Sequence, residues 1–140
     1  MIPLYAQQND YSAFDVLIVD DIPLNLTLVG KMLSRFNFQT RTAANGQQAL
    51  DAVAAKKPSL ILLDLMMPVV DGFQVIERLR AQPEMADIRI VVLSALNSNE
   101  DIVKAFNLGA NDFIMKPIIL ERLLTCVNTQ LQLVAAQTKA

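Results

Sequence analysis

The chain has 140 residues, enough for one compact domain and too few for two of ordinary size. A composition of 53% hydrophobic and 19% charged residues excludes an intrinsically disordered chain. The net charge of -2 offers no basic surface, so we expect no direct nucleic-acid binding. The single cysteine cannot form an internal disulfide, and the absence of histidine excludes catalytic triads and zinc sites that depend on imidazole.

The apolar segments of the chain are too short to cross a membrane. Runs such as residues 60–63 and 90–93 end at a polar residue, whereas a membrane-spanning helix needs about 20 mostly apolar residues. Residues 1–13 lack the basic start, apolar stretch and cleavage site of a signal peptide. We interpret residues 1–13 as a loose N-terminal tail and expect a cytoplasmic protein without membrane insertion.

The first half of the chain alternates short apolar runs with amphipathic segments. Residues 16–19 form a continuous apolar run, which predicts a strand buried on both faces. Pro23 suits the first turn of a helix, and apolar residues follow it at helical spacing as far as Phe36. The more polar residues 38–42 predict a strand at an edge of the sheet, and residues 47–56 predict a second helix.

The second half repeats this alternation. Gly109 has the position of a left-handed residue that ends a helix. Five strand–helix units predict an α/β fold, a flavodoxin-like doubly wound sheet of five parallel strands in the order 2-1-3-4-5 with helices on both faces. The strands of this half are predicted at residues 60–63, 89–93 and 112–115, and its helices at residues 73–79, at 98–108 and from 118 onward.

One domain is predicted at residues 14–130, and residues 131–140 are expected to extend the last helix and end in a tail. We expect the first two turns of the apolar stripe on that helix to cover the sheet, and Leu131 and Val134 to extend past it as in a coiled-coil seam. The stripe consists of Leu120, Leu124, Val127, Leu131 and Val134.

Polar side chains follow four of the predicted strands. Asp20 and Asp21 come directly after the first strand, Asp64 after the third, Ser94 after the fourth and Lys116 after the fifth. Each has an ordinary explanation by itself, as a helix cap, a turn former or a solvated charge. Because ligands of an open parallel sheet bind beyond the carboxyl ends of its strands, the convergence of all five predicts a functional site.

This set of side chains suits the chemistry of phosphoryl transfer. Carboxylates that lie close together repel one another, and a hard cation such as Mg²⁺, which prefers oxygen ligands, relieves the repulsion. An amine supplies a positive charge for an anion, and a hydroxyl hydrogen-bonds a phosphoryl oxygen. The site is therefore predicted to accept a phosphoryl group, with an aspartate as nucleophile.

The order and spacing of these residues resemble the receiver domain of bacterial two-component response regulators. This resemblance implies a phosphoprotein of phosphorelay signal transduction that takes a phosphoryl group from a histidine kinase or a histidine phosphotransfer protein. It then switches conformation to control a partner or an output domain. The segments that carry the resemblance are Val16–Asp21, Asp64–Gly72, Ser94-Ala95 and Gly109–Pro117.

The resemblance implies a magnesium site built on carboxylates. Asp21, Asp64 and the backbone carbonyl of Met66 are expected to bind Mg²⁺ directly. Asp20 is expected to bind the ion through a water molecule.

The resemblance also implies roles in phosphorylation and switching. Asp64 is expected to be the phosphoacceptor, with Ser94 and Lys116 as the other catalytic residues. Lys116 is expected to pair with Asp64 before phosphorylation and with the phosphoryl oxygens after it, and Pro117 to follow a cis peptide bond. Phe113 takes the place of a switch aromatic, although its position also fits a plain core residue of a strand.

Activation is expected to move Ser94 and Phe113 inward and to remodel one face of the domain. This face consists of the helix at residues 98–108, the strand at 112–115 and the last helix. We predict it as the partner surface and as the surface of a possible homodimer.

Two other functions are weighed against this one. An aspartate-nucleophile phosphatase of the haloacid-dehalogenase type needs an acid two residues after its nucleophile, where this chain has Met66. A degenerate receiver that only binds partners would lack the acidic pair, the acceptor or the lysine, all of which are present. We therefore expect a signalling module and not an enzyme, with autophosphorylation and autodephosphorylation as its only activities.

The lifetime of the phosphorylated form is expected to be long. Met66 and Leu96 stand two residues after Asp64 and Ser94, and neither side chain can hydrogen-bond a hydrolytic water. The output is left open, as is whether the chain is a single-domain regulator or part of a longer protein. The segment Asp21–Asn25 resembles receivers attached to hybrid histidine kinases.

Overall fold

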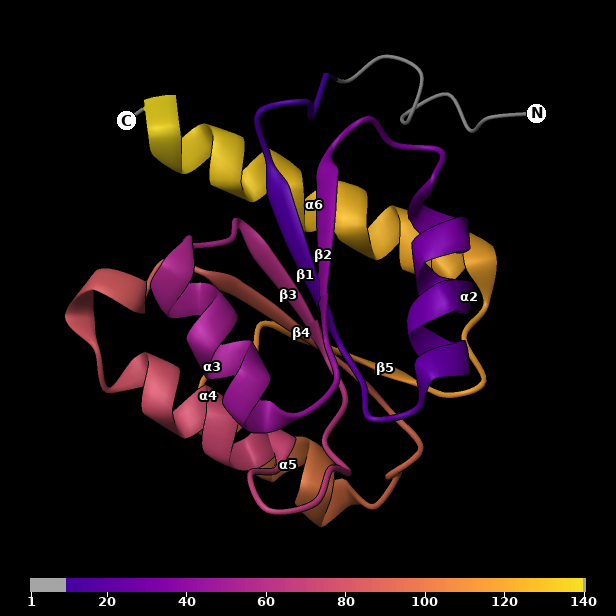
Figure 1. The fold of residues 1–140 in the computed structure, drawn as a ribbon, viewed down its shortest axis with the longest axis vertical. Coiled ribbons are helices and arrows are strands. Elements are labelled where there is room, and N and C mark those ends of the chain that lie inside the picture. Colours follow the sequence, from indigo (N-terminus) through magenta and orange to yellow (C-terminus); the bar gives the residue numbers. More distant parts are fainter. Residues whose placement is uncertain (1–9, 140) are drawn as a thin grey trace.

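The computed structural model describes residues 10–139 and has a parallel sheet between two layers of helices (Figure 1). The strands are hydrogen-bonded in the order β2-β1-β3-β4-β5, which confirms the predicted order and places β2 at an edge. The strands are β1 (Asp15–Val19), β2 (Gln39–Ala43), β3 (Leu60–Leu63), β4 (Arg89–Ser94) and β5 (Asp112–Met115).

Helices cover both faces of the sheet, as predicted. Of the helices within residues 10–139, none combines the length and the apolar character that crossing a membrane requires. A short 3-10 helix, η1 (Pro83–Met85), was not predicted. One face carries α2 (Pro23–Leu33) and α6 (Leu120–Lys139), and the other carries α3 (Gly46–Ala55), α4 (Gly72–Arg80) and α5 (Asn99–Leu108).

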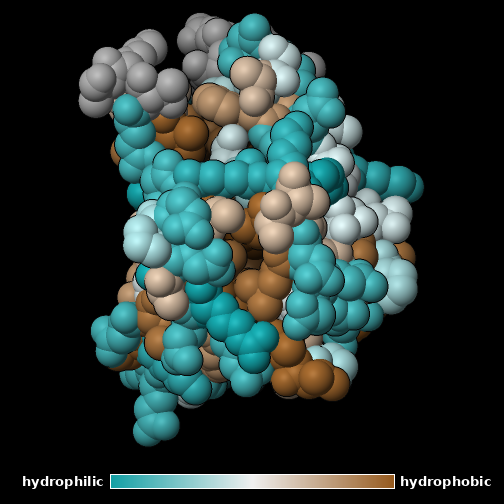
Figure 2. Space-filling view, turned by 60° about the vertical axis from the view of Figure 1, so that its left-hand side comes forward, coloured by the Kyte–Doolittle hydropathy of each residue, from teal (hydrophilic) through white to brown (hydrophobic). Residues whose placement is uncertain are grey.

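The central strands are buried on both faces, which explains their continuous apolar sequence. In β1, Leu17 and Val19 pack under α3, α4 and α5, whereas Val16 and Ile18 pack under α2 and α6. The four residues of β3 are all fully buried and alternate between the two cores in the same way. The side of the molecule with α3 and α4 shows mostly hydrophilic side chains (Figure 2), whereas Leu24 and Leu28 of α2 and Val103 of α5 are exposed.

Side-chain caps set where the helices of one layer begin. Asn45 accepts a hydrogen bond from the first turn of α3, and Ser98 does the same for α5. Asp71 and Gln74 form a reciprocal capping box at the start of α4. Gly109 ends α5 with φ of 121°, a left-handed conformation that favours glycine, as predicted.

The prediction that the first helix reaches Phe36 is wrong. The helix α2 ends at Leu33, where the hydroxyl of Ser34 donates to the carbonyl oxygen of Lys31. Phe36 is nevertheless buried, because its ring stacks on Phe38 with the two centroids 5.1 Å apart. Phe36 is therefore apolar because it is buried in the segment after the helix, and not because it belongs to the helix.

The interpretation of residues 1–13 as a loose tail does not hold at Tyr11. Residues 1–9 lie outside the described residues. Tyr11 is buried, its ring stacks on Phe14 with centroids 5.5 Å apart, and its hydroxyl donates to the side chain of Asn128 in α6. The packed part of the chain therefore begins before residue 14.

The apolar stripe of the last helix belongs to the core. Leu124, Val127 and Leu131 are all buried in the layer between the sheet, α2 and α6. The expectation that Leu131 extends past the sheet is wrong, because this side chain has no exposed surface. The helix begins at Leu120 rather than at Ile118, and its stripe does not form an exposed seam for a second chain at Leu131.

The loop between β3 and α4 contains a strained residue. Val69 has φ of 69°, in the left-handed region that β-branched residues avoid. The backbone N–H of Val70 donates to the carbonyl of Pro68 at 2.9 Å and closes a γ-turn around Val69. The side chain of Val69 is 96% exposed, so no packing compensates for the strain.

Val69→Gly is expected to raise the free energy of unfolding by about 1 kcal/mol, because glycine adopts this backbone conformation without a clash. Urea unfolding of the two proteins measures the difference. Val69→Thr is the matched control, since it keeps a β-branched side chain at the same φ and should leave stability unchanged. A glycine variant that is no more stable than the wild type would contradict the assignment of strain.

Candidate functional site

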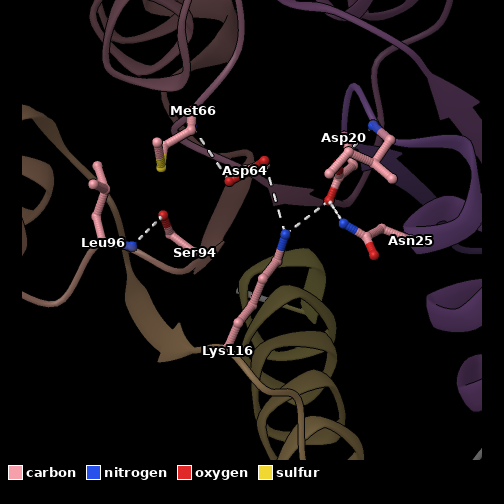
Figure 3. A network of polar contacts seen from close by, with 8 residues as sticks. Asp20, Asn25, Asp64, Met66, Ser94, Leu96 and Lys116 are labelled. Atoms are coloured by element: carbon pink, nitrogen blue, oxygen red, sulfur yellow. Dashed lines mark hydrogen bonds and ion pairs between the residues drawn. The ribbon is translucent and has the colours of Figure 1, made fainter.

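The pairing of β1 with β3 brings two of the predicted aspartates together. Val19 lies opposite Leu63 in the parallel register, and the backbone N–H of Asp64 donates to the carbonyl of Val19 at 3.0 Å. Asp20 and Asp64 therefore leave neighbouring strands side by side at the carboxyl edge of the sheet (Figure 3).

The pairing of β4 with β5 supplies the other two polar groups. The backbone N–H of Lys116 donates to the carbonyl of Ser94 at 2.8 Å, one step beyond the last pair of the ladder. The Lys116 side chain extends from this position toward the carboxylates (Figure 3). The peptide bond between Lys116 and Pro117, expected to be cis, is cis in the structure.

Three carboxylates form a group that could hold a metal ion. One oxygen from each of Asp20, Asp21 and Asp64 lies within 4.8 Å of the others. Asp20 and Asp64 are each only 5% exposed, whereas Asp21 is exposed and open to solvent. Because all three ligands are carboxylate oxygens, the group suits a hard divalent cation such as Mg²⁺.

The strand-end side chains also shape the loops that follow them. Asp20, Asp64 and Ser94 each accept a hydrogen bond from the backbone N–H two residues later, which turns the chain sharply out of its strand. The ordinary explanation as turn formers is therefore correct for these residues, and it holds together with a role in a site. The bonds run from Ile22 to Asp20 Oδ1 at 2.9 Å, from Met66 to Asp64 Oδ1 at 3.3 Å and from Leu96 to Ser94 Oγ at 3.1 Å.

Lys116 lies between the two buried aspartates. Its Nζ is 2.9 Å from Asp20 Oδ2 and 3.8 Å from Asp64 Oδ2 (Figure 3). The ion pair with Asp64 agrees with the resemblance, and the structure adds a closer one between Lys116 and Asp20. The lysine is 22% exposed, so both ion pairs are partly shielded from water.

Asn25 is a site residue that the sequence analysis did not assign to the site. Its side-chain amide donates to Asp20 Oδ2 at 3.1 Å from the first turn of α2. A sequence signal did exist, because a residue at the third position of a helix can reach back to the loop before it.

The electrostatic environment opposes a charge on Asp64. Burial raises the pKa of the Asp64 carboxyl, and the negative charges of Asp20 and Asp21 add to this rise. The ammonium group of Lys116 and the N–H of Met66 act in the opposite direction but do not cancel it. A bound cation would remove the conflict, which is the physical reason to consider a metal at this site.

Apolar side chains line the approach to Asp64. Met66 is 54% exposed, and Leu96 is half-buried beside Ser94 (Figure 3). Glycine at position 72 permits the close approach of this loop to Asp64, because a Cβ there would clash with the Asp64 carbonyl oxygen. Ser94 is fully buried.

Phe113 lies in the core on the sheet face covered by α3, α4 and α5. It is 8% exposed, so its ring packs inward in this structure, a position that fits both a core residue and the inward form of a switch aromatic.

The family of the chain follows from a match over most of its length. The family model of the response regulator receiver domain matches residues 16–128. This chain belongs to the response regulator receiver family. The match contains every residue of the site described above, and the receiver fold agrees with the five-stranded sheet of the structure.

Individual relatives support the same assignment. The DNA-binding dual master transcriptional regulator RpaA of Synechocystis is 37% identical over 117 residues, which cover 84% of this chain and 48% of RpaA. The response regulator PleD of Caulobacter vibrioides is 39% identical over 103 residues, which cover 74% of this chain and 23% of PleD. The receiver domain thus spans half or less of the length of these curated relatives.

A solved structure has the same architecture as this receiver domain. The signal receiver domain of a signal transduction histidine kinase from Syntrophus aciditrophicus superposes with a TM-score of 0.79 at 31% identity. The superposition covers 85% of this chain and 90% of that one, so the similarity extends over the whole domain.

Asp64→Asn is expected to stabilise the metal-free receiver domain near neutral pH. The pKa of Asp64 is higher in the folded protein than in the unfolded chain, so the free energy of unfolding decreases as the pH rises through the folded-state pKa. A neutral amide at this position does not ionise, so the variant avoids this decrease. The gain should disappear as the pH falls below 3.8, the ordinary pKa of the carboxyl, where aspartate is protonated in both states.

Urea unfolding across this pH range, in a buffer with a metal chelator, measures the difference. Asp51→Asn on the exposed surface of α3 is the control and should change little at any pH. A variant that is less stable than the wild type near neutral pH would contradict this account of Asp64.

Proposed function

We propose that this receiver domain accepts a phosphoryl group on Asp64 with the help of Mg²⁺ and transmits the change to a partner or an output domain. The observation that carries the proposal is the convergence of three carboxylates within 4.8 Å, with the Lys116 ammonium 3.8 Å from Asp64. The proposed nucleophile, the proposed cation site and a positive charge for an anion therefore lie together. Mg²⁺, when bound, neutralises negative charge on the carboxylates and on the transferred phosphoryl group.

The proposed reaction is a single displacement at phosphorus. A carboxylate oxygen of Asp64 forms the new bond to phosphorus, while the bond to the donor's leaving group breaks. Asp21 and Asp64, with the backbone carbonyl of Met66, are the proposed direct ligands of Mg²⁺, and Asp20 is proposed to act through water. Lys116 supplies positive charge to the phosphoryl oxygens, and the hydroxyl of Ser94 provides a hydrogen bond.

The phosphoryl donor lies outside these 140 residues, because they contain no histidine that could carry the group. A histidine kinase or a histidine phosphotransfer protein is the proposed donor. The proposed output is the control of a partner or of an output domain. This chain covers only the receiver part of relatives such as RpaA and PleD.

The proposed output face consists of α5, β5 and α6. Ser94 and Phe113 connect the phosphorylation site with this face, because they belong to the adjacent strands β4 and β5. Phe106 of α5 and Met115 of β5 are each more than 40% exposed and supply apolar contact area for a partner or a second copy of the chain. The proposed switch is a population shift that alters the position of these groups.

Asp64→Asn is expected to abolish phosphorylation by acetyl phosphate and Mg²⁺, because an amide is a poor nucleophile and a poor ligand for Mg²⁺. Intact-protein mass spectrometry measures the added phosphoryl group. Asp71→Asn is the matched control, since it makes the same chemical change in the same loop and keeps a good helix cap. Labelling of the Asp64 variant to the wild-type level would show that the acceptor lies elsewhere.

Met66→Asn and Leu96→Glu are each expected to shorten the lifetime of the phosphorylated protein, and the double variant more so. The wild-type side chains cannot orient a water in line with phosphorus, whereas the new polar groups can. The measurement is the first-order decay of phosphorylated protein with Mg²⁺ and no partner, with an expected acceleration of about tenfold for the double variant. Unchanged decay in all three variants would mean that this rim does not control hydrolysis.

A further inference from the structure

Asn25 holds one of the two aspartates that compete for Lys116. We propose that Asn25 is a positioning residue that sets how Lys116 is divided between Asp20 and Asp64. The inference rests on the proposed phosphorylation of Asp64 and assigns a task to a side chain outside the acidic cluster and the lysine. The juxtaposition that carries it is two donors, the Asn25 amide and the Lys116 ammonium, on the same oxygen of Asp20.

Both carboxylate oxygens of Asp20 accept hydrogen bonds in the structure. Asp20 Oδ1 accepts from the backbone N–H of Ile22 at 2.9 Å. Asp20 Oδ2 accepts from Asn25 Nδ2 at 3.1 Å and from Lys116 Nζ at 2.9 Å. Because Asp20 is 5% exposed, water offers little replacement for a donor that leaves.

Asp64 lies farther from Lys116 than Asp20 does. Its Oδ2 lies 3.8 Å from Lys116 Nζ, almost 1 Å farther than the distance to Asp20. A phosphoryl group on Asp64 would bring new negative charge to this side and attract the lysine toward it. The lysine must then give up at least part of its contact with Asp20.

Asn25 lowers the cost of this movement. When Lys116 turns toward Asp64, Asp20 Oδ2 still has the Asn25 amide as a donor. Without that amide, the departure of the lysine would leave this buried carboxylate oxygen with no side-chain donor and at most a metal-bound water, which is costly. A chain that lacks the amide would therefore keep Lys116 on Asp20 and respond less to a phosphoryl group.

The fold holds the Asn25 amide in place. Asn25 is the third residue of α2, and its backbone N–H donates to the carbonyl of Ile22 at 3.0 Å. Pro23 at the helix start restricts the backbone of this turn. Asn25 and Lys116 also line the same small pocket, so the two donors approach Asp20 from adjacent positions.

The test compares Asn25→Leu, which keeps the size of the side chain but removes the donor, with Asn25→Gln, which keeps an amide. The probe is beryllofluoride, which occupies the place of a phosphoryl group on a carboxylate, added to the full chain at saturating Mg²⁺. We expect Asn25→Leu to weaken beryllofluoride binding on the order of tenfold, and Asn25→Gln to recover part of the loss. Thr27→Val, an exposed change two residues farther along the same helix, is the control and should bind like the wild type.

The second readout reports on Lys116 itself. The NMR signal of its ε-methylene group is followed on addition of beryllofluoride, and thermal unfolding shows that each variant is folded. At saturation the signal should shift less in Asn25→Leu than in the wild type, because the lysine stays with Asp20. A shift of full size, or an unchanged affinity, would overturn the role of Asn25. Failure of the wild type to bind beryllofluoride would instead contradict the proposed phosphorylation, so the two failures are distinguishable.

Discussion

The parallel pairing of β1 with β3 is the constraint on which the rest of the site depends. The register places Val19 opposite Leu63, so Asp20 and Asp64 must leave the sheet as neighbours. Both strands are buried on both faces, and a slip by one residue would move every side chain to the opposite core. The same apolar packing that stabilises the sheet therefore holds two carboxylates together at its edge, where they are buried and repel each other.

The remaining parts of the site reduce this repulsion without removing it. Lys116 reaches both carboxylates from the far side of β4, and Asn25 supports Asp20 from α2. Burial still raises the pKa of Asp64, so a negative charge on this carboxyl stays unfavourable. Such a site would gain from binding a cation, because the cation offsets the repulsion between the carboxylates.

Most of the fold could be predicted from the sequence, because buried strands and capped helices leave local patterns. Residues 60–63 and 112–115 are strands as predicted, and Ser98 and Gly109 bound α5. The errors concern apolar residues whose burial depends on distant segments. Phe36 lies beyond its helix and packs on Phe38, Tyr11 is held by α6, and Leu131 is covered by the core. Apolar character alone does not tell which surface will cover a side chain.

The sequence by itself determined which chemical groups stand at the strand ends, since Asp20, Asp64, Ser94 and Lys116 each follow an apolar run. It also determined the turns after these strands, because a short polar side chain can bond the N–H two residues later without help from distant residues. Only the tertiary structure decided that Lys116 lies closer to Asp20 than to Asp64, and that Asn25 shares the same oxygen. The physical reason is that such contacts depend on distances between strands and helices far apart in the chain, and a difference of 1 Å decides which ion pair is the stronger.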